Sequence, residues 1–232
     1  MWLCNSSIGR KVVMSVTGLA LVLFLTFHAC MNVVAIFSED GYNMICEFLG
    51  ANWYAVAATA GLAALVVIHF VYAIMLTLQN RKARGSNRYA VTDKPAKVEW
   101  ASQNMFVLGL IVCLGLLLHL FNFWFNMMFA ELAGTTPVNN IDAADGYNMI
   151  VYTFHGAGVA SYVYAVLYVV WLGALWFHLT HGIWSGMQTL GANNKVWFCR
   201  LKTIGCWYAT IVVLLFLVVV LYFTFGGEAL LS

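Results

Sequence analysis

The stretch YVYAVLYVVWLGALWFHLTHGIWSGM, residues 162–187, contains no acidic residue, no lysine and no arginine, and it carries two histidines among its apolar side chains. A membrane-spanning helix requires about 20 mostly apolar residues, and this stretch supplies more than that. The whole chain has a similar composition, because 63% of its 232 residues are hydrophobic and 9% are charged. Soluble domains carry about 25% charged residues. We therefore expect an integral membrane protein.

Five stretches are long and apolar enough to be spans, at approximately residues 12–37, 53–79, 103–130, 151–187 and 204–226. They lack the alternation of membrane β-strands. Both prolines, Pro95 and Pro137, lie between spans, which predicts five uninterrupted helices. The fourth stretch is longer than a span needs and should tilt or extend beyond the bilayer. The first is too long to be the apolar core of a signal peptide, so we expect it to remain in the mature protein as a helix. We predict an all-α polytopic membrane protein, with residues 1–232 forming a single integral membrane domain.

The eleven basic residues all fall on one side of these spans. They are Arg10 and Lys11 before the first span; Arg81, Lys82, Arg84, Arg88, Lys94 and Lys97 between the second and third; and Lys195, Arg200 and Lys202 between the fourth and fifth. The loops on the other side carry acidic residues only, namely Glu39, Asp40, Glu47, Glu131, Asp142 and Asp145. The positive-inside rule predicts a cytoplasmic N-terminus, cytoplasmic basic loops and an external C-terminus.

Cysteine spacing and loop length exclude several functions. The six cysteines form neither C-x-x-C nor C-x-x-C-H, so zinc-ribbon, dithiol redox and c-type haem signals are absent. Cys46 lies in an outer loop and is open to oxidation. Every loop is shorter than about 25 residues, so chemistry on a water-soluble substrate would need a partner subunit. The basic loops favour lipid headgroups or an acidic subunit as partners, and no basic–aromatic surface indicates nucleic acid.

Each of the first four spans contains one histidine at a defined depth. Spans one and three carry His28 and His119 in their outer halves, and spans two and four carry His69 and His178 in their inner halves. The helical rise places the two layers roughly 10 Å apart. A four-helix core can hold a cofactor, and two facing imidazoles suit a six-coordinate haem iron. The pattern therefore favours two haem groups, with His28 paired with His119 and His69 paired with His178.

Other interpretations of these residues stay open at this point. A membrane histidine can instead bond a neighbouring helix, and four of them could line a proton or metal path. Small residues lie four positions from three of the histidines, at Ala73, Gly115 and Gly182, where they would admit a flat macrocycle or simply pack helices. His181 could replace His178 as the ligand or bond a haem propionate. His155, at the outer surface, is either an interfacial residue or part of a quinone site.

The chain resembles a family through two of its spans. HLTHGIW, residues 178–184, is similar to the fourth-span ligand motif of the di-haem cytochrome b anchors of bacterial succinate:quinone oxidoreductases, of the Bacteroides type. SIGRKVVMSVTGLALVLFLTFHACMN, residues 7–32, is similar to their first span. The resemblance extends over five spans and four histidines in order. It implies that His178, rather than His181, is the ligand.

The resemblance also implies a function. The chain would be the membrane anchor and electron-transfer subunit of a fumarate reductase or succinate dehydrogenase in the bacterial cytoplasmic membrane. A flavoprotein and an iron–sulfur subunit would dock on its cytoplasmic face, and electrons would pass between iron–sulfur clusters and menaquinone through two haems b. The dicarboxylate site would lie on a partner, whereas a quinone site would lie on this chain. Candidate quinone-site residues are Glu39, Asp40, Glu47 and His155. The direction of turnover and the oligomeric state stay open, a dimer of the complex included.

One position departs from the family. Some related fumarate reductases have a glutamate two residues before the fourth-span ligand, where it serves proton transfer, and this chain has Trp176 there. We therefore do not extend that proton path to this protein. The alternatives are the cytochrome b of a hydrogenase or formate dehydrogenase, and a haem-free transporter. Against a transporter, no acidic or basic residue lies deep in any span.

Overall fold

The computed structural model describes residues 6–84, 100–192, 194 and 196–226, and these residues form helices and turns without a β-strand. Among them, five helical stretches are long and apolar enough to cross a membrane: Ser7–Phe37, Trp53–Lys82, Trp100–Ala133, Val159–Ala192 and Trp197–Phe225. The predicted all-α polytopic architecture is therefore confirmed. Four basic residues of the predicted cytoplasmic loops lie outside the described residues, namely Arg88, Lys94, Lys97 and Lys195.

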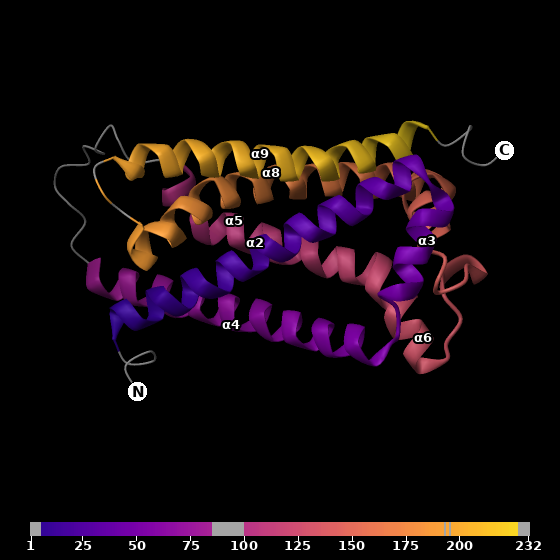
Figure 1. The fold of residues 1–232 in the computed structure, drawn as a ribbon, viewed down its shortest axis with the longest axis horizontal. Coiled ribbons are helices and arrows are strands. Elements are labelled where there is room, and N and C mark those ends of the chain that lie inside the picture. The colour runs from indigo at the N-terminus through magenta and orange to yellow at the C-terminus, as the bar shows by residue number, and fades with distance from the viewer. Residues whose placement is uncertain (1–5, 85–99, 193, 195, 227–232) are drawn as a thin grey trace.

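The spans form a bundle of long helices that α2 crosses obliquely. They are α2 (Ser7–Phe37), α4 (Trp53–Arg84), α5 (Trp100–His119), α8 (Val159–Met187, continued by the π-helical turn η4, Gln188–Ala192) and α9 (Trp197–Phe225). In Figure 1, α8 and α9 run side by side, and α2 passes from α4 at one end of the bundle to α9 at the other. We call the end where α2 and α9 begin the basic end, since Arg10, Lys11 and Lys202 lie there.

The opposite end carries the short helices and the acidic residues, and we call it the acidic end. It contains α3 (Glu39–Phe48), α6 (Ala130–Ala133), η2 (Val138–Asn140) and α7 (Gly146–Val151). Side-chain caps begin two of these helices, because Ser38 Oγ accepts from the Gly41 N–H and Asp145 Oδ1 accepts from the Asn148 N–H. The Asn43 amide donates to Asp145 Oδ1 and accepts from the Tyr147 N–H, at 3.0 and 2.9 Å. These bonds join α3 to α7.

The third span changes its helical register immediately after His119. The π-helix η1 occupies Leu120–Phe129 between α5 and α6, where a single regular helix was expected. The wider turn is accommodated by Asn126, whose amide donates to the carbonyls of Phe121 and Asn122 at 3.0 and 3.2 Å. The Asn126 side-chain oxygen also accepts from the Val138 N–H. Such π-segments are frequent at functional sites.

The predicted start of the fourth span, residue 151, is wrong. Residues 151–156 belong to a separate helical segment, α7 followed by the π-turn η3 (Tyr152–Gly156), and α8 begins at Val159. The break falls at Gly158, whose φ of +63° and ψ of −130° are accessible only to glycine at low energy. Ser161 stabilises the turn at this break, since its hydroxyl accepts from the Ala157 N–H and donates to the Tyr152 carbonyl.

Among the five spans, α8 and α9 have the largest buried share. Ser161, Ala209 and Phe223 have no exposed surface. In the most apolar stretch of each of these two helices, 33% of the residues are buried, whereas none are buried in that of α4. Since α4 packs mainly along α2, most of its apolar surface is available to lipid. The helix pair α8–α9 therefore forms the well-packed side of the bundle, and α4 its exposed side.

Candidate functional site

The structure brings the four span histidines together in two pairs. The rings of His28 and His119 have centroids 5.7 Å apart, and those of His69 and His178 have centroids 6.4 Å apart. Both pairs are close to perpendicular, with interplanar angles of 81° and 71°. The pair His69–His178 lies nearer the basic end and His28–His119 nearer the acidic end. Two imidazoles that approach each other from different helices are the donor set that an axially ligated haem iron needs.

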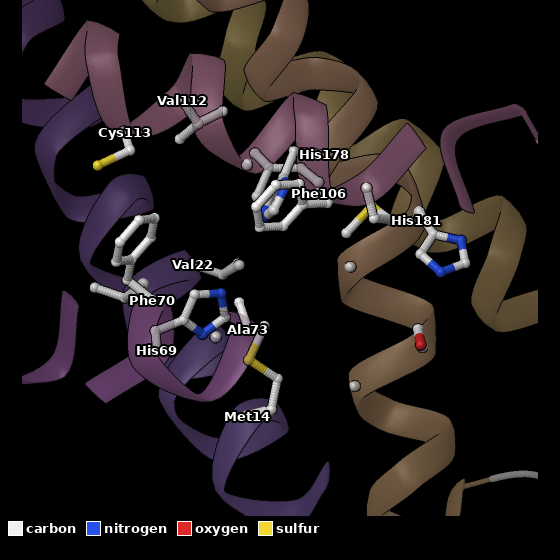
Figure 2. A pocket seen from close by; sticks show the side chains of 18 of the residues that line it. Met14, Val22, His69, Phe70, Ala73, Phe106, Val112, Cys113, His178 and His181 are labelled. Carbon is white, nitrogen blue, oxygen red and sulfur yellow. The ribbon is translucent and has the colours of Figure 1, made fainter. Parts of the chain in front are cut away.

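A cavity of about 360 Å³ separates the helices that carry the inner pair. Helices α2, α4, α5 and α8 all contribute to its walls, which are mainly apolar. Figure 2 shows His69 and His178 on different walls, with Ala73 beside His69, and Phe106 also lines the cavity. Gly182, four residues after His178, also lines the cavity. The inner pair thus has both the ring arrangement and adjoining space that a flat apolar macrocycle requires.

Two glycines on neighbouring helices receive the edges of the inner rings. A Cβ atom at Gly18 of α2 would lie 3.0 Å from His69 Cε1 and 3.5 Å from its Nδ1. A Cβ atom at Gly109 of α5 would lie 3.6 Å from His178 Cε1 and 3.9 Å from its Nδ1. Each ring therefore turns its Nδ1–Cε1 edge toward a bare stretch of backbone. The sequence does not indicate these contacts, because spacing along a helix reveals only the small residues on each histidine's own helix.

The Nδ1 atoms of the inner pair differ in their hydrogen bonding. His69 Nδ1 lies 3.1 Å from the hydroxyl of Thr17, on α2. His178 Nδ1 is buried without a hydrogen-bond partner. A buried polar atom left unpaired costs about 1–3 kcal/mol, and in a native structure it calls for an explanation such as a bound group. Two imidazoles on different helices beside an apolar cavity fit a haem at the inner pair.

Aromatic side chains enclose the outer pair. The His28 ring stacks on Phe24 with centroids 5.4 Å apart and lies 5.7 Å from Phe216. The His119 ring lies 5.2 Å from Phe123 and 5.8 Å from Trp171. The Trp171 indole also covers Gly115, since a Cβ there would lie only 2.1 Å from its ring, and its N–H donates to the Val112 carbonyl. The space that we expected Gly115 to leave for a macrocycle therefore holds an indole, which would have to turn aside.

Asparagine and tyrosine side chains connect the outer pair to the acidic end. The Asn32 amide donates to the His28 carbonyl at 2.8 Å and lies 3.4 Å from His28 Nδ1. The hydroxyl of Tyr42, on α3, donates to the Asn32 side-chain oxygen at 3.3 Å. Because Tyr42 is buried, this contact fixes α3 over the end of α2 that carries His28.

The remaining histidines lie apart from the two pairs. His181 is three residues beyond His178 on α8, contributes to the cavity wall and packs edge-on against Trp184 with centroids 4.9 Å apart. His155 lies in η3 at the acidic end and is partly buried. Of the acidic quinone-site candidates, Glu39, Asp40 and Glu47 are exposed on α3. The structure therefore places all four quinone-site candidates at the acidic end, away from the inner pair, whereas His181 lines the same cavity as His178.

Trp176, two residues before His178, has a packing role. Its indole N–H donates to the Thr210 hydroxyl of α9 at 2.9 Å. Thr26 of α2 and Tyr208 of α9 are also hydrogen-bonded to each other. Polar contacts of this kind hold helices together in a bilayer, so Trp176 attaches α8 to α9 and points no titratable group toward the inner pair.

A second cavity, of about 500 Å³, lies on the basic side of the first and shares part of its wall. Its own residues are polar and include Lys11, Gln188 and Thr189. An apolar chamber that leads to a polar, cationic one matches a planar apolar molecule with carboxylates on one edge.

No cluster of three or more histidine, cysteine or acidic side chains occurs within the described ranges, so the metal-binding potential of this part of the chain rests on histidine pairs. The site of the predicted ligands is thus two pairs of rings, one beside a cavity and one enclosed. Comparison with protein-family models, with curated proteins and with solved structures gave no match to this chain.

Proposed function

We propose that this protein is a di-haem cytochrome b, the membrane anchor and electron-transfer subunit of a bacterial fumarate reductase or succinate dehydrogenase that reacts with menaquinone. The observation that carries the proposal is the inner pair, in which His69 and His178 approach from different helices beside a cavity of about 360 Å³. The order of histidines along the chain and the resemblance of its first and fourth spans support the same conclusion.

The inner site would hold one haem through His69 and His178, and the outer site a second through His28 and His119. Bound haem would supply one-electron redox chemistry, and the chain supplies ligation, spacing and the surrounding polarity. At the inner site, Ala73 and Gly182 would allow the macrocycle to approach α4 and α8, and Lys11 would attract its carboxylates. At the outer site, Trp171 must turn away from Gly115 to make room.

The basic end would face the cytoplasm and bind the flavoprotein and iron–sulfur subunits. The positive-inside rule supports this orientation, and basic residues at the ends of α2, α4 and α9 favour an acidic partner surface. The acidic end would then handle menaquinone on the outer side, with His155 and Glu39 as candidate proton acceptors. Purification of the tagged chain from membranes should recover a flavin-containing subunit and an iron–sulfur subunit in equal amounts.

The decisive experiment is a haem count on the purified chain. A dithionite-reduced minus oxidised spectrum and a pyridine haemochrome assay should give two haems b per chain. His69→Ala or His178→Ala should remove the inner haem, and His28→Ala or His119→Ala the outer one. His181→Ala is the matched control, and it should retain both. A chain without haem would contradict the proposal and would favour a histidine-lined proton or ion path, whereas loss of haem in His181→Ala but not in His178→Ala would reassign the inner ligand.

A further inference from the structure

The hydroxyl of Thr17 is placed to control one histidine of the inner pair. Thr17 lies on α2 one residue before Gly18, and only 5% of its surface is exposed. Its Oγ1 is 2.8 Å from the Val13 carbonyl, 3.1 Å from the Met14 carbonyl and 3.1 Å from His69 Nδ1. A threonine hydroxyl has one proton to donate and two lone pairs to accept with, so its direction of donation decides the state of the imidazole.

The two carbonyl contacts fix that direction. Carbonyl oxygens only accept hydrogen bonds, and two oxygens 2.8 Å apart without a proton between them repel each other. The Thr17 proton therefore points to its own helix, as serine and threonine hydroxyls in membrane helices commonly do. Its oxygen is left to accept from His69, so Nδ1 of that ring carries the proton. In a neutral imidazole the lone pair is then on Nε2.

Gly18 makes the contact possible. Because a Cβ at position 18 would lie 3.0 Å from His69 Cε1, any larger residue would push the ring away from α2 and from the Thr17 hydroxyl. The adjacent threonine and glycine thus act together: the glycine admits the ring edge and the threonine bonds it. At the other inner histidine the corresponding glycine is Gly109, and the residue before it is the buried, apolar Leu108. His178 Nδ1 accordingly has no partner.

We infer that Thr17 is a positioning residue that holds His69 in the Nδ1–H tautomer, with Nε2 available to bind the iron of the inner haem. The iron-binding part of this inference rests on the proposed function, and the tautomer does not. Acceptance of a hydrogen bond from Nδ1–H fixes the ring and makes Nε2 a more basic ligand, and loss of such a contact typically lowers metal affinity by about 10- to 100-fold. A more basic ligand favours ferric over ferrous iron, so Thr17 should lower the midpoint potential of the inner haem.

Thr17→Val tests the inference because valine keeps the branched shape and removes the hydroxyl. We expect inner-haem affinity to fall about tenfold or more, the midpoint potential of that haem to rise and its low-spin EPR signal to shift. Thr17→Ser should restore all three. The matched control is Thr26→Val, because Thr26 lies on the same helix, bonds its own Val22 carbonyl in the same way and contacts Tyr208 instead of a histidine. That variant should leave the inner haem unchanged.

Two outcomes of the haem measurements are distinguishable. If the wild-type chain binds haem but Thr17→Val leaves affinity, potential and EPR signal unchanged, the positioning role is wrong while the proposed function stands. If the wild-type chain binds no haem, the proposed function fails. The tautomer is then tested directly by nitrogen-15 NMR of the histidine-labelled chain, with His69→Gln to assign the signals. The inference is supported if Nδ1 of His69 carries the proton in the wild type and this proton is lost or moves to Nε2 in Thr17→Val. A proton on Nε2 in the wild type overturns it.

Discussion

Gly18 shows how a single absent methyl group can make room for a ring from a neighbouring helix. Its bare backbone receives the His69 ring edge, and a Cβ there would force the ring to give by a few tenths of an ångström. Gly18→Ala should therefore lower haem retention at the inner site by about tenfold, the lower end of what disturbed ligand surroundings cost. A haem count after detergent washing would measure this.

The control for this prediction lies on the helix that carries His69. A Cβ at Gly61 of α4 would meet nothing within 4 Å. Gly61→Ala should therefore keep its haem and gain up to about 1 kcal/mol of helix stability. Equal haem retention in both alanine variants would show that the ring tolerates the shift and that Gly18 has only a packing role.

Partial burial lowers the reactivity of the Cys46 thiol. Its thiol lies against Gly146 and Tyr42, and desolvation raises its pKa to about 11. At pH 8 the thiolate should amount to roughly 0.1% of the total, about a hundredfold less than for an exposed cysteine. We therefore expect Cys46 to oxidise slowly at neutral pH. Maleimide labelling of a variant with Cys46 as its only cysteine should accelerate about tenfold per pH unit from 8 to 10, and a plateau near pH 9 would contradict this.

The histidines could be predicted from the sequence because an imidazole within an apolar stretch stands out, and helical rise alone gives its depth. Thr17 and Gly18 could not, since the rotation of α2 about its own axis decides what faces His69, and α2 has apolar side chains on every face. Gly115 was misjudged for the same reason. The depth of a small residue is visible in the sequence, but whether a ring from another helix fills the space beside it is not.

At the scale of elements, the turn at Gly158 decides where α8 begins. Its backbone conformation strains any residue with a Cβ, at a cost of about 1–3 kcal/mol. Gly158→Ala should lower the free energy of unfolding by that amount in an SDS titration. Gly173→Ala, also on the α8 segment and with nothing within 4 Å of its Cβ, should show no loss. Equal stability of the two variants would mean that the turn adapts without strain.

Element boundaries were predictable where polarity changes and not where only backbone geometry changes. The starts and ends of α2 and α4 coincide with polar or charged residues, so the composition locates them within a few residues. The segment from 151 to 187 contains no acidic residue, lysine or arginine, so charge does not mark the break at Gly158, although Gly156 and Gly158 beside His155 are a turn signal. The π-helix after His119 is hidden in the same way, although the recurrence of Asn122 and Asn126 among aromatic residues is a signal that could have indicated it.

At the scale of the whole molecule, the two ends of the bundle differ in charge and in structure. Helices α3, α6 and α7 cover the acidic end, and its carboxylates lie on α3, on α6 and in the loop before α7. The basic end consists of the ends of long helices. The positive-inside rule predicts that a membrane protein with this asymmetry inserts with the basic end inside. The acidic end would then face outward, together with the histidine pair nearer to it.

Cysteine accessibility in intact cells tests this orientation. In a chain freed of its own cysteines, Asp40→Cys should react with a membrane-impermeant maleimide, because Asp40 is exposed in the first turn of α3. Arg81→Cys, exposed near the end of α4, should react only after the cells are permeabilised. Labelling of both variants in denaturant shows that each thiol is competent. The reverse pattern would place the basic end outside, and a flavoprotein and iron–sulfur partner could then no longer bind it from the cytoplasm.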